Sequence, residues 1–526
     1  MTLLNPLWNG KKDRLPYEVR NDLESPVSSP ESSQVAEVIS AWLISRLAEL
    51  LKLKTHEIDL HKDLTDYGLN SIEAVNFSGD LENFLGRRLS PTLLWDYPTI
   101  EALTEYLASD TAEVPAAKEI PPEYYRFELS PEYRQLQQQL EEIKTLGIGN
   151  PFFTVQERVV NDTTLIGGRK LINYATYNYL GMSGDPAVSR AAKEAIEQYG
   201  TSASASRLLS GEKPLHRQLE REIADFIGTE DSIVYVGGHA TNVTTIGHLF
   251  GQNDLILHDF LSHNSILQGC FLSGATIIAF PHNDWQALDR VLRDRRHRYK
   301  RVLIVIEGVY STDGDIPDLP KFIEVKKRHK AFLMVDEAHS IGVLGKRGRG
   351  IGEFFGVDPA DVDLWMGTLS KSFASCGGYI AGSKAFVEYL KYTAPGFVYS
   401  VGISPPNAAA TLAAIGVLKA EPERVACLQE RAKLFLELAR ERGLNTGLSK
   451  DSPVVPIIVG DSLKSVQLSQ NLFERGINVP FMFYPSVPKN AARLRFFITC
   501  THTEEQIRFT VETLAAEFAK LEQSTD

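Results

Sequence analysis

A lysine and an aspartate, each at the end of an apolar run, are the residues of this chain best placed to do chemistry. Asp336 ends the run Ala331–Val335, and Lys371 follows a second strand-like run that closes with Gly-Thr-Leu-Ser. A buried carboxylate needs a cationic or hydrogen-bonding partner, and the protonated ring nitrogen of pyridoxal 5'-phosphate is one. A lysine amine forms a Schiff base with the aldehyde of the same cofactor. The pair therefore predicts a pyridoxal 5'-phosphate site.

A second position suited to covalent chemistry lies far upstream. Gly68-Leu69-Asn70-Ser71-Ile72 follows a polar loop and leads into an amphipathic run, so Ser71 stands at the start of an expected helix. A serine there is either an ordinary helix cap or the attachment point of a 4'-phosphopantetheine arm. The helical runs on both sides favour a carrier domain. A thioester carrier joined to a carbanion-generating enzyme predicts a carbon–carbon condensation.

Length, charge and cysteine content limit the classes of protein. The chain has 526 residues, 43% hydrophobic and 23% charged, which is typical of a globular protein with more than one domain. A net charge of −12 argues against nucleic acid or an anionic membrane as the main partner. The four cysteines are scattered, which indicates reduced thiols. Since neither a signal peptide nor a membrane span of about 20 apolar residues is evident, we expect a soluble, cytoplasmic protein.

Composition and periodicity divide the chain into five segments. Residues 1–30 are rich in Pro, Ser and Asn and are expected to be disordered. Residues 31–109 carry short amphipathic runs that predict a small helix bundle, the carrier. Residues 110–130 contain several prolines and are expected to form a linker. Residues 131–400 are expected to form the large cofactor-binding domain, opened by a charged helix, and residues 401–526 a small α+β domain.

The large segment has the pattern of an α/β fold. Helical stretches such as Pro214–Ile227 and Pro320–His329 separate continuous apolar runs. Continuous runs are typical of parallel strands covered on both faces, so we expect a doubly wound, mostly parallel sheet. The expected strands of both domains are Ser232–Val236, Leu255–His258, Ala275–Phe280, Val302–Ile306, Ala331–Val335, Tyr379–Ala381, Val454–Val459 and Leu494–Thr499.

Seven short motifs follow one another in the order of a single enzyme family. Together they resemble the α-oxoamine synthases, fold-type-I pyridoxal phosphate enzymes with the aminotransferase class I and II fold, over roughly residues 170–515. The resemblance implies an acyltransferase that joins an amino acid to an acyl thioester and works as a homodimer. The motifs are Asn178-Tyr-Leu-Gly181, Leu261-Ser-His263-Asn-Ser, Glu307-Gly-Val-Tyr-Ser-Thr-Asp-Gly314, Val335-Asp336-Glu-Ala-His339-Ser-Ile-Gly-Val, Gly348-Arg-Gly350, Thr368-Leu-Ser-Lys371 and Arg493-Leu-Arg495.

The same resemblance implies roles for the residues around the cofactor ring. Lys371 would be the Schiff-base lysine and would move the Cα proton of the substrate. Asp336 would hold the ring nitrogen in its protonated form. His263 would stack on the ring, which suits a planar imidazole over an electron-poor ring. His339 would form a hydrogen bond with the ring hydroxyl.

Anion-binding residues complete the implied site. Gly238 and His239 lie where a strand turns through glycines into a helix, which presents backbone N–H groups to a phosphate, and Thr368 is a second phosphate ligand. Arg495 resembles the arginine that binds the carboxylate of the amino acid, with Arg493 as the neighbouring alternative. No metal ion is expected.

Three positions depart from the family patterns. Asn70 precedes Ser71, where carrier domains usually have Asp. His239 stands where many relatives of the synthase have Phe or Tyr. Val401-Gly402 replaces a Thr/Ser pair through which a partner subunit usually contacts the phosphate. A dimer is still expected, but the sequence does not establish whether the partner subunit contacts the phosphate through Val401-Gly402.

The two halves of the chain together predict a decarboxylative Claisen condensation. An amino acid (Gly, Ala and Ser all fit) would react with an acyl thioester to give a 2-amino ketone, carbon dioxide and a free thiol. The acyl group would arrive on the phosphopantetheine of Ser71, installed by a phosphopantetheinyl transferase, rather than on free coenzyme A.

Two alternatives stay open. One is an aminotransferase whose carrier presents the substrate, which the Glu307–Gly314 and His339–Gly350 motifs disfavour. The other is a scaffold that docks carriers without catalysis, which the intact Lys371, Asp336 and His263 oppose.

Overall fold

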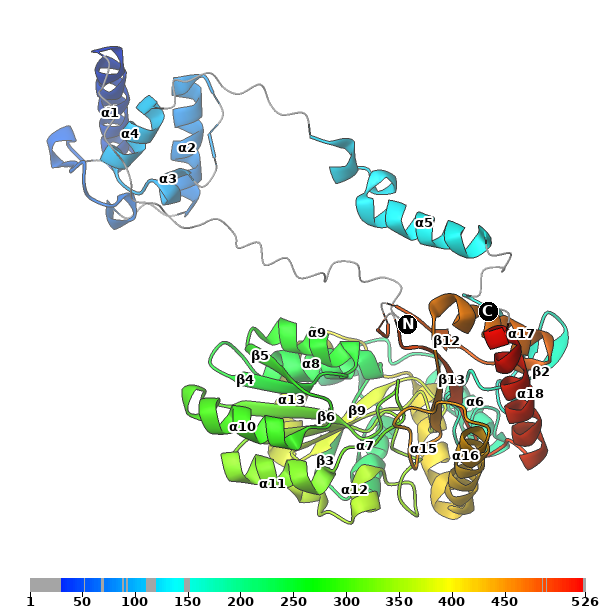
Figure 1. Cartoon of the computed structure of the whole chain (residues 1–526). Coiled ribbons are helices and arrows are strands. Elements are labelled where there is room, and N and C mark those ends of the chain that lie inside the picture. Colours follow the sequence, from blue (N-terminus) through cyan, green and yellow to red (C-terminus); the bar gives the residue numbers. More distant parts are fainter. Residues whose placement is uncertain are drawn as a thin grey trace. The chain divides into compact units, whose positions relative to one another are not determined.

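The computed structural model of the chain contains two compact units (Figure 1). The described residues from 30 to 142 belong to one unit, and those from 143 to 523 belong to the other. The structure describes residues 30–51, 53–67, 71–87, 89–90, 93–109, 120–145, 152–484, 486–488 and 490–523. The disorder expected for residues 1–30 concerns residues that lie, except for Pro30, outside this description. Within the described residues, no helix is both long and apolar enough to cross a membrane.

The smaller unit is a helix bundle with its own core. On α1, Ile39, Leu43 and Leu47 recur every four residues and are buried, as expected for one apolar helix face. Leu81 of α2 and Leu103 of α4 are fully buried in the same core. The elements are α1 (Pro30–Leu51), η2 (Thr55–Glu57), η3 (Leu64–Tyr67), α2 (Ser71–Leu85), α3 (Leu93–Asp96) and α4 (Ile100–Ser109).

Part of the expected linker has helical structure. Residues 120–130 contain two 3-10 turns, η4 (Pro122–Tyr124) and η5 (Phe127–Leu129), while residues 110–119 lie outside the described chain. The charged helix expected next is α5 (Pro131–Thr145). The hydroxyl of Ser130 accepts a hydrogen bond from the backbone N–H of Tyr133, which caps this helix.

A seven-stranded sheet forms the centre of the larger unit, in the order β3-β9-β8-β7-β6-β4-β5. Six strands are parallel, and β9 runs antiparallel to both of its neighbours. The expectation of a doubly wound, mostly parallel sheet is therefore confirmed. The strands are β3 (Asp231–Tyr235), β4 (Leu255–Asp259), β5 (Thr276–Phe280), β6 (Val302–Glu307), β7 (Phe332–Asp336), β8 (Leu364–Thr368) and β9 (Gly378–Gly382).

Helices cover both faces of this sheet (Figure 1), which explains the continuous apolar runs. Along β6, Ile304 and Ile306 face one core, while Leu303 and Val305 face the other. The helices of the first core are α6 (Pro186–Tyr199), α7 (Pro214–Ile227), α10 (Trp285–Arg295), α11 (Leu319–His329), α12 (Ile351–Phe355) and α15 (Pro405–Ala420). Those of the second are α8 (Gly238–Leu249), α9 (Asn264–Ser273), α13 (Lys384–Thr393) and α14 (Pro395–Val398). Short turns η6 (Arg207–Gly211), η7 (Arg296–Arg298) and η8 (Pro359–Asp361) connect them.

A third core joins the C-terminal part of the chain to an earlier hairpin. Residues on both sides of the boundary expected at residue 400 pack together. α15, which follows that boundary, packs against the large sheet, whereas β2, which precedes it, pairs with β11. The small sheets have the orders β10-β13-β12 and β1-β2-β11. Their elements are β1 (Thr163–Ile166), β2 (Arg169–Asn173), α16 (Glu423–Glu441), β10 (Val454–Gly460), α17 (Ser462–Glu474), β11 (Ile477–Asn478), β12 (Phe481–Met482), β13 (Ala492–Phe497) and α18 (Glu504–Gln523).

Candidate active site

Most of the predicted site residues gather at one edge of the large sheet. Glu307, Asp336 and Thr368 are the last residues of the neighbouring strands β6, β7 and β8. His263 follows β4 by four residues, and Lys371 follows β8 by three. Because parallel strands end at the same edge, their loops converge there, and this edge is where open α/β sheets bind ligands.

A chain of hydrogen bonds links Asp336 to His263. The side-chain amide of Asn242, in α8, donates to Asp336 Oδ2 at 2.8 Å and to Ser265 Oγ at 2.9 Å. Because the Ser265 hydroxyl accepts from Asn242, its own proton is donated to His263 Nδ1, at 2.7 Å. The backbone N–H of Ser265 also donates to Nδ1, at 3.2 Å. His263 Nδ1 is therefore an acceptor, and the ring proton of the neutral imidazole sits on Nε2.

The surroundings of His263 keep its ring neutral. The ring opens into the site, while its Nδ1 edge is enclosed by Ser265. Burial lowers the pKa of His263, and the nearby Lys371 lowers it further against the opposing effect of Asp336. Its backbone N–H donates to Glu307 Oε1 at 2.6 Å. Burial, with the adjacent Asp336 carboxylate, raises the pKa of Glu307 well above its ordinary value.

Lys371 lies half-buried in the same pocket. Burial lowers the pKa of its amine to about 8, with Arg495 acting in the same direction and with Asp336 and Glu307 opposing. Its Nζ lies 5.5 Å from the ring centroid of Tyr177, within cation–π range. An amine with this pKa is partly neutral near pH 8, as a nucleophile or a base must be.

His339 is buried in an aromatic cluster. Its Nδ1 lies 2.8 Å from the Tyr179 hydroxyl, and its ring lies nearly parallel to that of Phe497, 6.3 Å away. Burial lowers the pKa of His339 well below its ordinary value and raises that of Tyr179. The phenol is therefore the donor and Nδ1 the acceptor, so that Nε2 of His339 carries the proton and is free to donate it.

The start of α8 and the end of β8 form a cradle with almost no side-chain volume. A Cβ atom on Gly238 would lie 2.8 Å from Thr368 Oγ1, and one on Gly378 would lie 2.8 Å from Gly238 Cα. Glycine thus lets the N-terminus of a twelve-residue helix approach β8, with its first backbone N–H groups directed outward. His239 follows as the second residue of α8 and is exposed.

The structure separates the two candidate arginines on β13. Arg493 is buried and paired with Asp313 at 2.6 Å, so its charge is already compensated. Arg495 instead donates to the Ser311 carbonyl oxygen at 2.9 Å and lies 3.4 Å from the Tyr177 hydroxyl. Among the described residues its buried Nε has no hydrogen-bond partner. Arg495 is therefore the arginine that keeps donors for a ligand.

The chemistry of these groups fits pyridoxal 5'-phosphate. Asp336 offers a buried carboxylate, Lys371 an amine of lowered pKa, and His339 a free ring N–H. The backbone N–H groups at the start of α8, beside Thr368, suit a phosphate. Asn242 Oδ1 is buried and receives no hydrogen bond from any described residue, so one acceptor still lacks a donor.

Several residues of the site were not singled out from the sequence. Asn242 reaches Asp336 only through a tertiary contact, and a helical Asn carries no local signal of such a role. Ser265 contacts His263 from two residues away and closes the Leu261-Ser-His263-Asn-Ser motif, so a signal was present for it. Tyr179 belongs to the Asn178-Tyr-Leu-Gly181 motif, so a signal was present for it. Ser71, in contrast, is in the other compact unit, where it is the first residue of α2; Gly68–Asn70 lie outside the described residues.

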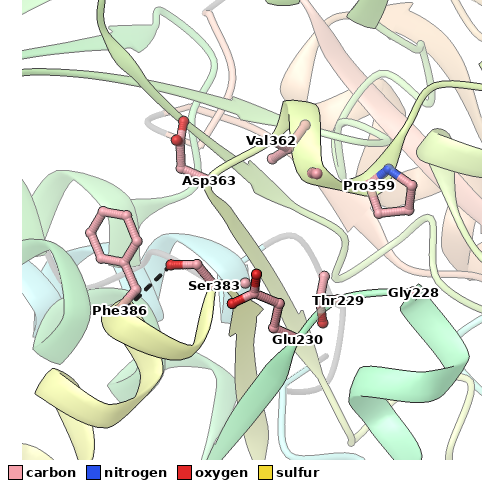
Figure 2. A pocket seen from close by; sticks show the side chains of 10 residues that line it. Gly228, Thr229, Glu230, Pro359, Val362, Asp363, Ser383 and Phe386 are labelled. Carbon is pink, nitrogen blue, oxygen red and sulfur yellow. Dashed lines mark hydrogen bonds between the residues drawn. The ribbon is translucent and has the colours of Figure 1, made fainter.

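A pocket of about 280 Å³ lies at the opposite edge of the sheet, where β8 begins (Figure 2). Two carboxylates line it, and both already have partners. Glu230 accepts from the backbone N–H of Lys384 at 2.7 Å, and Asp363 pairs with Lys326 at 2.8 Å. We therefore assign no ligand to this pocket.

Comparison with known proteins agrees with the geometry. The aminotransferase class I and II family matches residues 169–514, and the phosphopantetheine attachment site family matches residues 41–107. The 8-amino-7-oxononanoate synthase of Symbiobacterium thermophilum is 40% identical over 386 residues, 73% of this chain and 97% of that protein. Serine palmitoyltransferase 3 of Caenorhabditis elegans is 38% identical over 358 residues, 65% of this chain and 70% of that protein.

A solved structure shares the fold of the larger unit. Serine palmitoyltransferase from S. paucimobilis, determined with a bound PLP–myriocin aldimine, superposes with a TM-score of 0.72 and 31% identity, over 75% of this chain and 99% of that one. The expected family, fold class and cofactors, pyridoxal 5'-phosphate and 4'-phosphopantetheine, are thereby confirmed. The chain belongs to the α-oxoamine synthases, pyridoxal phosphate-dependent acyltransferases of the aminotransferase class I and II fold, and carries a phosphopantetheine attachment domain ahead of the enzyme.

Proposed function

We propose that this chain catalyses the decarboxylative Claisen condensation of an amino acid with an acyl thioester carried on its own phosphopantetheine domain. The observation that supports this most is the pair of contacts around Tyr177. The amine of Lys371 lies 5.5 Å from its ring centroid, and Arg495 lies 3.4 Å from its hydroxyl. A base and a carboxylate-binding group thus flank one aromatic side chain, as an amino acid substrate requires.

The residues at the strand ends would hold the cofactor. Asp336 would bind the ring nitrogen, His263 would lie against the ring, and His339 would donate its Nε2–H to the ring hydroxyl. Gly238, His239 and Thr368 would surround the phosphate. Pyridoxal 5'-phosphate, when bound, supplies the electron sink that makes a Cα–H bond acidic.

On the substrate side, Arg495 would bind the carboxylate through two parallel N–H donors, since its Nε has no partner among the described residues. Lys371, with a pKa of about 8, would accept the Cα proton.

The condensation is balanced in atoms and electrons. The Cα–H electron pair forms a bond to the thioester carbonyl carbon. The C–S bond breaks with its electron pair on sulfur, and the phosphopantetheine thiolate takes a proton from solvent to leave as the thiol. The carboxylate carbon then leaves as carbon dioxide, and its electron pair returns to Cα, which takes a proton back from Lys371. The product is a 2-amino ketone one carbon shorter than the sum of the two substrates.

We propose the carrier half of the reaction on Ser71. A phosphopantetheinyl transferase would attach the arm to its hydroxyl at the start of α2, and an acyl group would be loaded on the terminal thiol. We further propose a homodimer, because large apolar side chains are exposed in the helices α9 and α13 and in the segments that follow β4 and α14. They include Phe260 (70% exposed), Leu272 (65%), Tyr392 (64%) and Tyr399 (88%).

Intact-protein mass spectrometry tests the proposal. The phosphopantetheinylated, cofactor-loaded chain is acylated and then mixed with glycine, alanine or serine. We expect one amino acid to remove the acyl mass, with release of carbon dioxide, in the wild type but not in Lys371→Ala. Ser71→Ala should acquire neither the arm nor the acyl mass. Persistence of the acyl mass with every amino acid would contradict carrier-fed condensation, and amino transfer without carbon dioxide would identify an aminotransferase.

A further inference from the structure

His282 lies between two buried carboxylates that belong to different loops of the site. Its Nδ1 is 2.8 Å from Asp259 Oδ1, and its Nε2 is 2.8 Å from Asp315 Oδ2. Asp259 is fully buried, and Asp315 is 7% exposed. The next residue, Asn283, repeats the bridge, since its backbone N–H donates to Asp259 Oδ2 at 2.8 Å and its side chain to Asp315 Oδ2 at 2.6 Å.

On the first side, the bridge fixes the loop that carries His263. Asp259 ends β4, and the same Oδ1 that contacts His282 accepts the backbone N–H of Leu261 at 2.8 Å. The backbone N–H of Ser262 donates to the Asp259 carbonyl oxygen at 3.0 Å. The tight turn so formed leads directly into His263, the N-cap of α9. The position of the His263 ring therefore depends on the carboxylate of Asp259.

On the second side, the bridge fixes the loop that contacts the arginines of β13. The Asp315 carbonyl oxygen accepts the backbone N–H of Tyr310 at 3.1 Å, which closes residues 310–315 into a loop. Within that loop, the Ser311 carbonyl oxygen accepts from Arg495 at 2.9 Å. The ring of Tyr310 also packs edge-on against His282, with the centroids 4.5 Å apart.

The chemistry of the bridge requires a cation. Both ring nitrogens face carboxylate oxygens, so both must donate, and only a doubly protonated ring does so. Burial alone would lower the pKa of His282, but the two carboxylates outweigh it and raise the pKa to about 10. At neutral pH one imidazolium thus compensates two buried negative charges.

We propose that His282 is a positioning residue, which sets the distance between the loop bearing His263 and the loop holding Arg495 by bridging Asp259 and Asp315. It touches neither substrate nor cofactor and acts through these two loops. The inference rests on the proposed function, in which His263 faces the cofactor ring and Arg495 binds the amino acid.

The test compares His282→Gln with His329→Gln. His329 is a matched control because it also contacts a buried carboxylate, Asp289, at 2.8 Å and is 12% exposed, but lies at the end of α11, at the opposite edge of the sheet. Three quantities are measured on the cofactor-loaded chain. They are the visible circular dichroism of the bound cofactor, the dissociation constant of glycine, alanine or serine read from cofactor absorbance, and the rate of acyl loss from the acylated chain at saturating amino acid.

We expect His282→Gln to change the dichroism and to weaken amino acid binding roughly tenfold or more, the usual effect of losing a charged hydrogen bond. The rate of acyl loss at saturating amino acid should change far less. His329→Gln should lower the melting temperature and leave all three quantities unchanged. If His282→Gln does no more than His329→Gln, the proposal is overturned.

Asp315→Asn provides a second route, should His282→Gln fail to fold. This substitution keeps the ion pair of His282 with Asp259 and weakens only the contact of His282 with residue 315, in the loop that holds Arg495. Amino acid binding should therefore weaken, while the dichroism of the cofactor stays near that of the wild type. Unchanged amino acid binding in Asp315→Asn would also overturn the proposal. Failure of the proposed function itself would look different, because the wild type would then give no product that depends on an amino acid.

Discussion

The Tyr179 hydroxyl lies 2.8 Å from Nδ1 of His339, and both side chains are buried. Since burial holds the phenol protonated and the imidazole neutral, the contact fixes one tautomer of His339. Its Nε2–H is then the donor that faces the site. A residue of the Asn178-Tyr-Leu-Gly181 motif thus determines what a residue 160 positions later can donate.

Tyr179→Phe should leave Nδ1 of His339 without its donor. We expect a loss of about 1–3 kcal/mol in the free energy of unfolding, the usual result of a buried polar atom without a partner, and a shifted absorbance of the bound cofactor. Urea unfolding and visible spectroscopy measure the two effects. Tyr174→Phe is the control, since it removes an equally buried hydroxyl, bonded to Thr510 at 3.0 Å, from the third core. An unshifted spectrum in Tyr179→Phe would contradict the assigned role.

The amine of Lys371 should titrate near pH 8 in the cofactor-free chain. Burial lowers its pKa to about 8, well below the ordinary value of about 10.4. Below that pH the amine is protonated and unreactive, and above it the neutral amine accumulates. Limited labelling with an amine reagent, followed by peptide mass spectrometry across pH 6–11, should give a midpoint near 8 for this lysine. A midpoint above 10 would contradict the prediction.

Substitution of Arg493 should lower stability, whereas substitution of Arg495, on the same strand β13, should weaken amino acid binding. Arg493→Met leaves the carboxylate of Asp313 buried without its cation, and we expect a loss of about 3–5 kcal/mol in stability. Arg495→Lys keeps a charge but loses paired donors, so stability should hold while amino acid binding weakens by roughly 1.5–3 kcal/mol. Thermal unfolding and spectral titration with the amino acid separate the two. Equal effects of both variants on amino acid binding would contradict the distinction.

Local patterns predicted the strand ends well, because an apolar run followed by a polar residue marks where a buried strand meets solvent. Asp336 and Lys371 were found in this way. The strand predicted over Leu494–Thr499 is observed over Ala492–Phe497. The shift arises because Leu494 faces the third core, and Ala492 is also buried, while Arg493 between them points to the other side and breaks the apolar run.

Two parts of the structure were not predicted from the sequence: a hydrogen bond between distant residues of the site, and the β1–β2 hairpin. The amide of Asn242 meets a carboxylate 94 positions away, which no local pattern reveals. The β1–β2 hairpin did have a signal. Gly167 and Gly168 adopt φ values of 56° and 73°, and a two-residue glycine turn between short strands is typical of hairpins.

His282 should give the protein a characteristic loss of stability at alkaline pH. Its folded pKa of about 10 lies above the unfolded value of about 6.5, so its contribution is fully present below about 6.5 and is lost as pH rises through about 10. The groups that face it are Asp259, Asp315 and Tyr310. The difference in unfolding free energy between wild type and His282→Gln should shrink over this window, by less than about 1.4 kcal/mol per pH unit. A difference independent of pH would show that the ring is neutral.

The helix bundle of residues 30–109 should unfold separately from the enzyme. The described residues of its core all lie between residues 36 and 108, and Leu43 among them is fully buried. Leu43→Ala should cost this unit about 2–5 kcal/mol, through lost burial and the cavity left behind. Calorimetry of the full chain should show one transition moving to lower temperature and a second one unchanged. Leu257→Ala, at an equally buried position in β4, is the matched control and should move only the second transition. A single transition displaced by either substitution would mean that the two units unfold together, and that the carrier is held by the enzyme rather than joined to it by the chain alone.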